Sequence, residues 1–160
     1  MRIRRATAAD CAPMWAVHTR AIRHGCASHY APGDIAAWSG RMTPESYAEP
    51  LFTRTLLVAE VDDGRVAGFA QFEPGEGVIE GVYVDPDFMR QGVGRALVAA
   101  VEDEAVRLGI ERISLDASLN AVPFYSALGY AIEGDLRHPL GGGHSIGCKL
   151  MSKRLRAEPA

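Results

Sequence analysis

The sequence contains little cysteine, and its cysteines are widely separated. The 160-residue chain has three, Cys11, Cys26 and Cys148, with no Cys-x-x-Cys pair. An odd number of scattered thiols predicts neither a zinc knuckle nor a disulfide framework, so we expect reduced structural cysteines. The first three of the five histidines are spaced six and five residues apart, which places them on different faces of any helix. We therefore expect no metal site.

Long hydrophobic runs and an excess of positive charge are also lacking. No apolar stretch approaches the ~20 residues that cross a bilayer, and the opening MRIRRATAADCAPMW has no signal-peptide core. Seventeen Lys and Arg against twenty Asp and Glu give a net charge of −3. That balance offers no general attraction for nucleic acid or an anionic membrane. We expect a cytosolic protein with neither of these partners.

The composition is that of an ordinary globular domain. Hydrophobic residues make up 48% of the chain and charged residues 23%. A chain of this size buries ~70% of its unfolded surface as one domain. Because no repeat or linker interrupts it, we expect a single domain over residues 1–160.

The apolar pattern predicts strands and helices in mixed order. Strands are expected at 3–6, 55–61, 66–72, 78–84, 113–117, 130–136 and 145–155. Helices are expected at 7–24, opened by a Thr7–Asp10 capping box, at 32–38, from 43, at 94–108 and at 121–128. A helical crossover between 78–84 and 113–117 makes those two strands parallel, whereas Asp-Asp-Gly at 62–64 indicates an antiparallel hairpin. The fold class is therefore α+β, or mixed α/β.

A glycine turn follows the strand expected at 78–84. Gly92 and Gly94 lead into the next helix, and glycine allows the backbone to approach a ligand closely. The first turn of a helix has unpaired N–H groups and the positive end of the helix dipole, which together favour phosphate. Arg90 and Arg95 add positive charge, and Gln91 adds a neutral donor.

A Gly-x-Gly turn alone admits other interpretations. A helix entered through glycine without any ligand is one of them. A dinucleotide fingerprint needs Gly-x-Gly-x-x-Gly, but Leu97 occupies the last position. The phosphate-loop pattern G-x-x-x-x-G-K-[ST] does not occur, so that class of nucleotide site is excluded.

Two segments carry a resemblance to a known family. VYVDPDFMRQGVGRAL, residues 82–97, resembles the acyl-CoA-binding motif of the GCN5-related N-acetyltransferase (GNAT) superfamily, [Q/R]-x-x-G-x-[G/A] after a strand. LDASLNAVPFYSALGY, residues 115–130, is similar to the family's second motif, a strand, an asparagine and a short Phe-Tyr helix. The resemblance covers the whole chain in element order and is specific over residues 58–130. Met89 departs from the pattern, because Gln or Arg is usual there, which puts one side-chain contact in doubt.

The resemblance implies a fold and an activity. The fold is a central, mostly antiparallel twisted sheet of about seven strands with one parallel pair and about four flanking helices. Residues 78–130 form the acyl-CoA-binding core, and residues 8–51 cover the acceptor. The activity is that of a bacterial acetyltransferase in which an amine attacks the thioester of acetyl-CoA within a ternary complex. The implied cofactor-binding residues are Val82, Tyr83, Val84, Arg90, Gln91, Gly92, Val93, Gly94, Arg95 and Asn120.

The catalytic candidates are Tyr125 and Glu80. Tyr125 stands where the family motif carries the acid that protonates the leaving thiolate, although it could equally be a packing residue beside Phe124. Strand alternation puts Glu80 on one face with Val82 and Val84, where apolar surroundings would raise the pKa of a base. A solvated glutamate, with water as the proton acceptor, remains an alternative. Asn120 is implied to bind the pantetheine arm, and an ordinary N-cap is its structural alternative.

The acceptor is less well specified. His29, Tyr30 and Trp38 are candidate substrate contacts, although aromatic residues on amphipathic helices are more often core residues. The loop at 141–143, with His138 and His144, could close over the acceptor. A small-molecule amine is favoured, because the long helical segment at the N-terminus suggests a covered pocket. A protein or peptide N-terminus and a non-catalytic acyl-CoA-binding module are the alternatives, and a homodimer is possible by resemblance alone.

Overall fold

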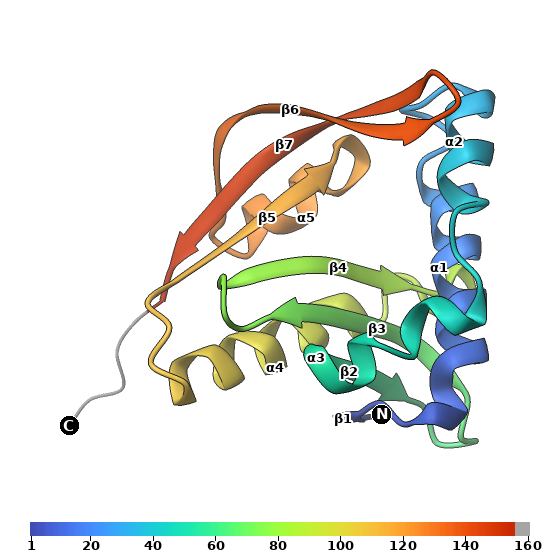
Figure 1. Cartoon of the computed structure of the whole chain (residues 1–160). Coiled ribbons are helices and arrows are strands. Elements are labelled where there is room, and N and C mark those ends of the chain that lie inside the picture. The colour runs from blue at the N-terminus through green and yellow to red at the C-terminus, as the bar shows by residue number, and fades with distance from the viewer. Residues whose placement is uncertain (156–160) are drawn as a thin grey trace.

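A computed structural model describes residues 1–155, which are built around one seven-stranded sheet (Figure 1). The strands lie in the order β1-β2-β3-β4-β5-β7-β6, and β4 and β5 form the one parallel pair among them. The bounds are β1 Arg2–Arg5, β2 Thr55–Glu60, β3 Val66–Glu73, β4 Val78–Val84, β5 Arg112–Ser118, β6 Ala131–Gly141 and β7 His144–Arg154. The expected mostly antiparallel sheet with a single parallel pair is confirmed.

Five α-helices and four short 3-10 helices connect the strands. The α-helices are α1 Cys11–Gly25, α2 Pro32–Ser39, α3 Pro50–Thr53, α4 Val93–Arg107 and α5 Val122–Ala127. The 3-10 helices are η1 Ala8–Asp10, η2 Pro44–Tyr47, η3 Pro86–Phe88 and η4 Leu119–Ala121. The helix expected from residue 43 is η2, followed by the single turn of α3, and the other four helices expected from the apolar pattern are α1, α2, α4 and α5. None of these helices combines the length and the apolar character that a membrane span requires.

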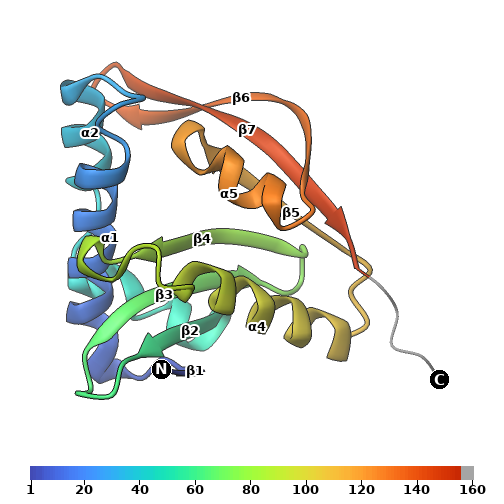
Figure 2. The ribbon, with the colours of Figure 1, turned by 180° about the vertical axis from the view of Figure 1, so that it is seen from behind.

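Two hydrophobic clusters form on opposite faces of the first four strands. Leu97 and Val101 of α4 are fully buried with Phe72 of β3 in one cluster. Met14 of α1 and Phe69 of β3 are buried in the other. Residues 69 and 72 serve different faces because side chains alternate along a strand. Figures 1 and 2 show α4 running along one side of the sheet, with α1 and α2 standing across the end where β4 and β5 part.

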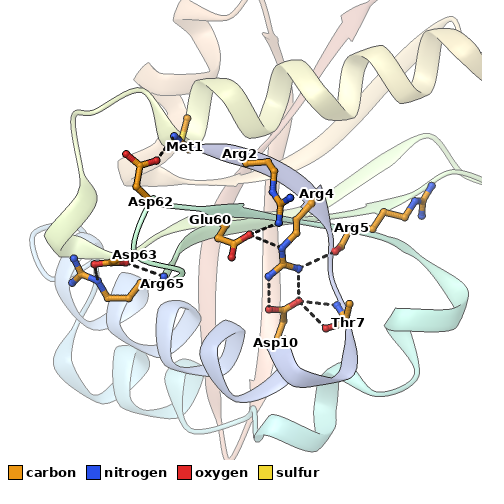
Figure 3. Close-up of polar contacts among 10 residues, drawn as sticks. All are labelled: Met1, Arg2, Arg4, Arg5, Thr7, Asp10, Glu60, Asp62, Asp63 and Arg65. Atoms are coloured by element: carbon orange, nitrogen blue, oxygen red, sulfur yellow. Dashed lines mark hydrogen bonds and ion pairs between the residues drawn. The ribbon is translucent and has the colours of Figure 1, made fainter.

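The start of the chain is fastened by a charged network (Figure 3). The Arg4 guanidinium donates to both carboxylate oxygens of Asp10, at 2.8 and 3.0 Å, and to Glu60 of β2 at 2.9 Å. The Asp10 carboxylate also accepts from the Thr7 amide at 2.7 Å, and the expected capping box is present. The hydrogen bonds from Arg4 are the main reason that the pKa of Asp10 is lowered. This network joins β1, β2 and the entry to α1.

The parallel pair is very short. Among the described residues, β4 and β5 are paired only at Val78–Ser114 and Ile79–Leu115, after which the strands diverge into a fork (Figure 1). A β-bulge lies at the same level, because Gln71 of β3 pairs with Gly81 while Phe72 pairs with Ile79. Glu80 is therefore the extra residue. A bulge bends its strand and increases the local twist, which suits a point where two strands separate.

The last hairpin runs farther than its sequence suggests. β6 and β7 remain paired as far as Gly141 and His144, so the expected 141–143 loop is a tight turn. Its tip is attached to α2 by His144 Nδ1 and Asp34 Oδ1 at 2.9 Å. Residues 141–143 all have positive φ, which glycine adopts without strain. The turn therefore ends a hairpin that is paired to its tip.

Candidate active site

Three cavities occupy the fork between β4 and β5. Their volumes are about 320, 140 and 60 Å³, and Trp38, Tyr83 and Ser118 line all three. The 140 Å³ cavity extends towards Met89 and Asn120, and the 320 Å³ cavity extends towards the β6–β7 hairpin. The small cavity shares lining residues with both and therefore lies between them. We call these three adjoining cavities the passage; its two ends are lined differently.

The candidate anion site is the start of α4, near the Met89 end. Gly92 caps this helix with φ +80°, and Arg90 also has a positive φ of +62°. The Ala96 amide bonds back to the Gly92 carbonyl at 3.0 Å, so the amides of residues 93–95 precede the first intrahelical hydrogen bond. A Cβ added at Gly92 would have no atom within 4 Å. Free space therefore adjoins Gly92, next to a helix start whose unpaired N–H groups would suit a phosphate.

The second glycine of the motif has a packing role. A Cβ at Gly94 would lie 3.1 Å from the Phe124 ring of α5 and 3.4 Å from Val84. Gly94 therefore lets α4 approach α5 and β4 closely. Arg90, Gln91 and Arg95 are exposed around this helix start, while Val93 is buried in the core. Met89 is 44% exposed and lines the 140 Å³ cavity.

Asn120 lies on the opposite wall of the same cavity, in η4. Its Oδ1 accepts from the Cys26 thiol at 3.3 Å. Its Nδ2 would lie 3.4 Å from a Cβ at Gly25, so the end of α1 fixes the position of the amide. Asn120 thereby links the end of α1 to the segment that follows β5.

Tyr125 lies deep in the small central cavity, on α5. It is 5% exposed and meets Phe124 and Tyr130 edge to face, with ring centroids 5.0 and 5.7 Å apart. Burial raises the pKa of Tyr125 well above its usual value, because the phenolate would lose its hydration. The hydroxyl therefore stays protonated over the physiological pH range, as a proton donor requires.

Glu80 lies where the fork begins, but not in the surroundings expected for it. Its Oε1 accepts from Arg54 Nε at 2.7 Å and from Gln71 Nε2 at 3.0 Å, and the residue is exposed. Val82 and Val84 pack in the cluster beneath α4, whereas the bulge turns Glu80 towards Gln71. The expectation that Glu80 shares their face and lies among apolar side chains is therefore wrong. Glu80 nevertheless lines both the central and the 320 Å³ cavities.

Tyr83 separates the passage from the core beneath α1. Its ring stacks on His18, with centroids 3.9 Å apart. A Cβ at Gly81 would lie only 2.5 Å from that ring, so the tyrosine requires glycine two residues earlier. Sequence reasoning did not identify Gly81. A glycine inside an apolar strand is the signal that could have found it, since it often marks a bulge or a close approach.

The expected acceptor residues separate into two groups. Trp38 lines all three cavities. The Tyr30 hydroxyl instead donates to the Gly147 carbonyl at 2.5 Å and accepts from the Leu119 amide at 2.8 Å, which ties the chain before α2 to β7 and η4. His29 is exposed beside Ser28 and does not line these cavities. The structure therefore brings only Trp38 of the three to the passage.

The 320 Å³ cavity contains Asp116, which sequence reasoning did not assign to a site, beside His138, which it placed near the acceptor. His138 Nε2 of β6 lies 2.8 Å from Asp116 Oδ2 of β5, and both residues line this cavity with Glu80 and Arg41. Asp116 also lines the central cavity with Tyr125. Alternation marks Asp116 as the charged position between buried Leu115 and Ala117, but its pairing with β6 depends on strand order. Within residues 1–155, no group of three or more His, Cys, Asp or Glu side chains is arranged to hold a metal ion.

Comparison with known proteins gives one consistent result. The family described as the acetyltransferase (GNAT) domain matches residues 26–138. The uncharacterized N-acetyltransferase YafP of Escherichia coli K12 is 27% identical over 131 residues, which are 81% of each protein. A crystal structure of a GCN5-related N-acetyltransferase from Rhodopseudomonas palustris superposes with a TM-score of 0.89 at 27% identity, covering 96% of this chain and 95% of that one. The PaiA N-acetyltransferase of Thermoplasma acidophilum, in complex with coenzyme A, has the same fold, with a TM-score of 0.79 at 19% identity over 96% and 98% of the two chains.

Proposed function

The chain belongs to the GNAT acetyltransferase family, and we propose that it transfers the acetyl group of acetyl-CoA to the amino group of a small molecule. The observation that carries this proposal is the passage through the fork. One end of it lies near the helix start of α4, the buried side chain of Tyr125 lines its central cavity, and carboxylates line the other end. Two substrates entering from opposite ends would meet beside Tyr125.

The residues at the α4 end fit coenzyme A. The amides of residues 93–95, with Arg90 and Arg95 close by, suit its pyrophosphate. Gln91 adds a donor at the same turn, and Asn120 offers an amide to the pantetheine arm. When bound, acetyl-CoA supplies an acetyl thioester that an amine can attack. Met89 lines this end without a charge, so the arginines of the loop provide the positive charge in our proposal.

The open edge of β4 suits the developing oxyanion. β4 is paired with β3 along one side, while its other side has no partner in the described chain beyond Ile79. Alternate N–H groups along residues 82–84 therefore point into the fork, and backbone donors of this kind stabilise the oxyanions of acyl transfer. Tyr125 protonates the departing thiolate. Glu80, at the start of the fork, attracts the acceptor ammonium and holds it beside the thioester.

The acceptor cavity favours a small molecule over a polypeptide. It is lined by Trp38 from α2 and by His138, Leu140 and Ile146 from the β6–β7 hairpin. At about 320 Å³ it lies at the lower end of the range for small-ligand sites. Its walls come from two separate elements, α2 and the β6–β7 hairpin, which suits a small acceptor better than an extended peptide.

Thermal unfolding with saturating acetyl-CoA, with NADH and ATP as controls, tests the first half of the proposal. A ligand at 100 times its Kd stabilises by ~2.7 kcal/mol, or roughly 5–10 °C for a domain of this size. We expect this shift with acetyl-CoA and not with the controls. A shift with NADH alone, or none at all, would contradict the acetyltransferase proposal.

Release of the coenzyme A thiol tests the second half. The protein is incubated with acetyl-CoA and a panel of acceptors: n-butylamine, tyramine, spermidine, lysine and a hexapeptide with an N-terminal alanine. We expect turnover with a small amine and little with the peptide. Turnover of the peptide alone would replace the small-molecule proposal with an N-terminal acetyltransferase. Binding of acetyl-CoA without turnover of any acceptor would favour a binding module.

A further inference from the structure

Two carboxylates face each other where β4 and β5 part. The last pair in the parallel ladder is Ile79 with Leu115, so Glu80 and Asp116 are the first residues beyond it on their strands. Both line the central cavity, which also contains Tyr125, and both line the 320 Å³ cavity. An ammonium group that enters the fork therefore meets one carboxylate on each side.

The two carboxylates have different partners. Glu80 Oε1 accepts from Arg54 and Gln71, whose donors cannot take up a proton. Asp116 Oδ2 lies 2.8 Å from Nε2 of His138, which can. In a neutral ring that donates its Nε2 hydrogen to Asp116, Nδ1 has the free lone pair. A carboxylate that orients an imidazole in this way is a recurrent arrangement for a general base.

We propose that His138, oriented by Asp116, is the catalytic base that accepts the proton of the acceptor ammonium. This inference rests on the proposed acetyl transfer. The ammonium N–H bond breaks, and the proton passes directly or through one water to Nδ1 of His138. The nitrogen keeps the electron pair with which it attacks the thioester. The resulting imidazolium is paired with the Asp116 carboxylate and releases its proton to solvent, since the His138 side chain is 46% exposed.

Histidine suits this step better than a carboxylate does. A general base is most effective when its pKa lies near the working pH, and histidine titrates closest to neutrality of the common side chains. Glu80 then retains its charge and holds the ammonium in place. The titratable and charged groups that line the cavity with His138 are Asp116 of β5, Glu80 and Tyr83 of β4, Cys148 of β7 and Arg41 after α2.

The hairpin supplies a matched control. His144 lies on β7 near the turn, with Nδ1 2.9 Å from Asp34 Oδ1, and its side chain is 43% exposed against 46% for His138. It does not line the three cavities of the fork. His144→Gln therefore removes a paired hairpin histidine of similar exposure without touching the proposed base.

The test is the pH dependence of kcat/KM between pH 5.5 and 9.5, with the best acceptor of the panel. For wild type and His144→Gln we expect a rise that levels off near neutral pH. His138→Gln should lose about 100-fold at pH 7, and its rate should keep rising towards the pKa of the amine, so that the deficit narrows at high pH. Asp116→Asn should keep the plateau but reach it at a different pH. A His138→Gln profile parallel to that of wild type would overturn the assignment.

A second measurement needs no turnover. The histidine ring signals of the coenzyme A complex are followed by NMR while n-butylamine is added at pH 7.5. We expect the His138 signals to move and the His144 signals to stay. Unmoved His138 signals at saturating amine would overturn the proposal even if the enzyme is active. Failure of acetyl-CoA to stabilise the protein would instead count against the proposed function itself.

Discussion

His18 should make the stability of this protein fall in mildly acidic solution. The side chain is 8% exposed, its Nδ1 lies 2.6 Å from the Tyr47 hydroxyl, and its ring stacks on Tyr83. Nε2 is buried without a hydrogen-bond partner among the described residues. A proton added there would place a charge and an unsatisfied donor in the core. Burial accordingly lowers the pKa of His18 to about 4.

The size of the effect follows from the difference in pKa between the folded and unfolded states. Histidine in an unfolded chain has a pKa of about 6.5, so below that value the unfolded state binds a proton that the folded state refuses. The stability associated with neutral His18 is therefore complete above pH 6.5 and is lost as the pH falls towards 4. The loss is about 2 kcal/mol at pH 5 and about 3 kcal/mol when complete. Asp10 and Glu60 have lowered pKa values, so the stability that they contribute is lost only as the pH falls below their ordinary pKa values of 3.8 and 4.5.

Urea unfolding at pH 7.5 and pH 5 measures this loss directly. Wild type should lose about 2 kcal/mol between the two conditions. His18→Gln should be less stable at pH 7.5 but should lose much less on acidification, because glutamine does not titrate. His24→Gln, which removes an exposed histidine from the same helix, should behave like wild type. Equal losses in wild type and His18→Gln would refute the reasoning.

Three further predictions concern the site and the start of the chain. Tyr125→Phe should lower kcat about 100-fold while the Kd for acetyl-CoA, measured by calorimetry, stays unchanged; an unchanged kcat would leave only a packing role. Gly94→Ala should destabilise by about 1–3 kcal/mol through its contact with the Phe124 ring, whereas Gly92→Ala, which has room but a positive φ, should cost about 1 kcal/mol, both read from thermal unfolding. Asp10→Asn should lower the free energy of unfolding in urea by about 2 kcal/mol, because it removes one of the two carboxylates that pair with the partly buried Arg4, and a loss below 0.5 kcal/mol would contradict that account.

The strand order could be predicted from the sequence because its signals are local. The Asp-Asp-Gly turn at 62–64 and the crossover through α4 set the neighbours of β3, β4 and β5, and the structure confirms the parallel pair. The glycine turn before α4 was also recognisable, since a glycine just before an apolar helical pattern indicates a turn into a helix from the neighbouring residues alone. Gly94 also makes room for the Phe124 ring, and that contact could not be predicted because it depends on the packing of α5.

The surroundings of Glu80 could not be predicted because one residue changes the strand register. Alternation from Val78 to Val84 assumes an unbroken ladder, and the bulge at Glu80 reverses its face. The Asp116–His138 contact could not be predicted for a related reason. Its partners are 22 residues apart on strands separated by β7, so that only the completed sheet brings them together.

In the fork, the same change to the backbone would raise stability and lower activity. Beyond Ile79 and Leu115, β4 and β5 turn open edges towards each other inside the molecule, where other chains cannot add a strand. Each further pair between them would add backbone hydrogen bonds and would also narrow the passage past Tyr125. Variants selected only for resistance to heat should therefore include some that extend this ladder and lose turnover. The unfinished ladder is the part of the fold that selection for stability alone would be expected to remove.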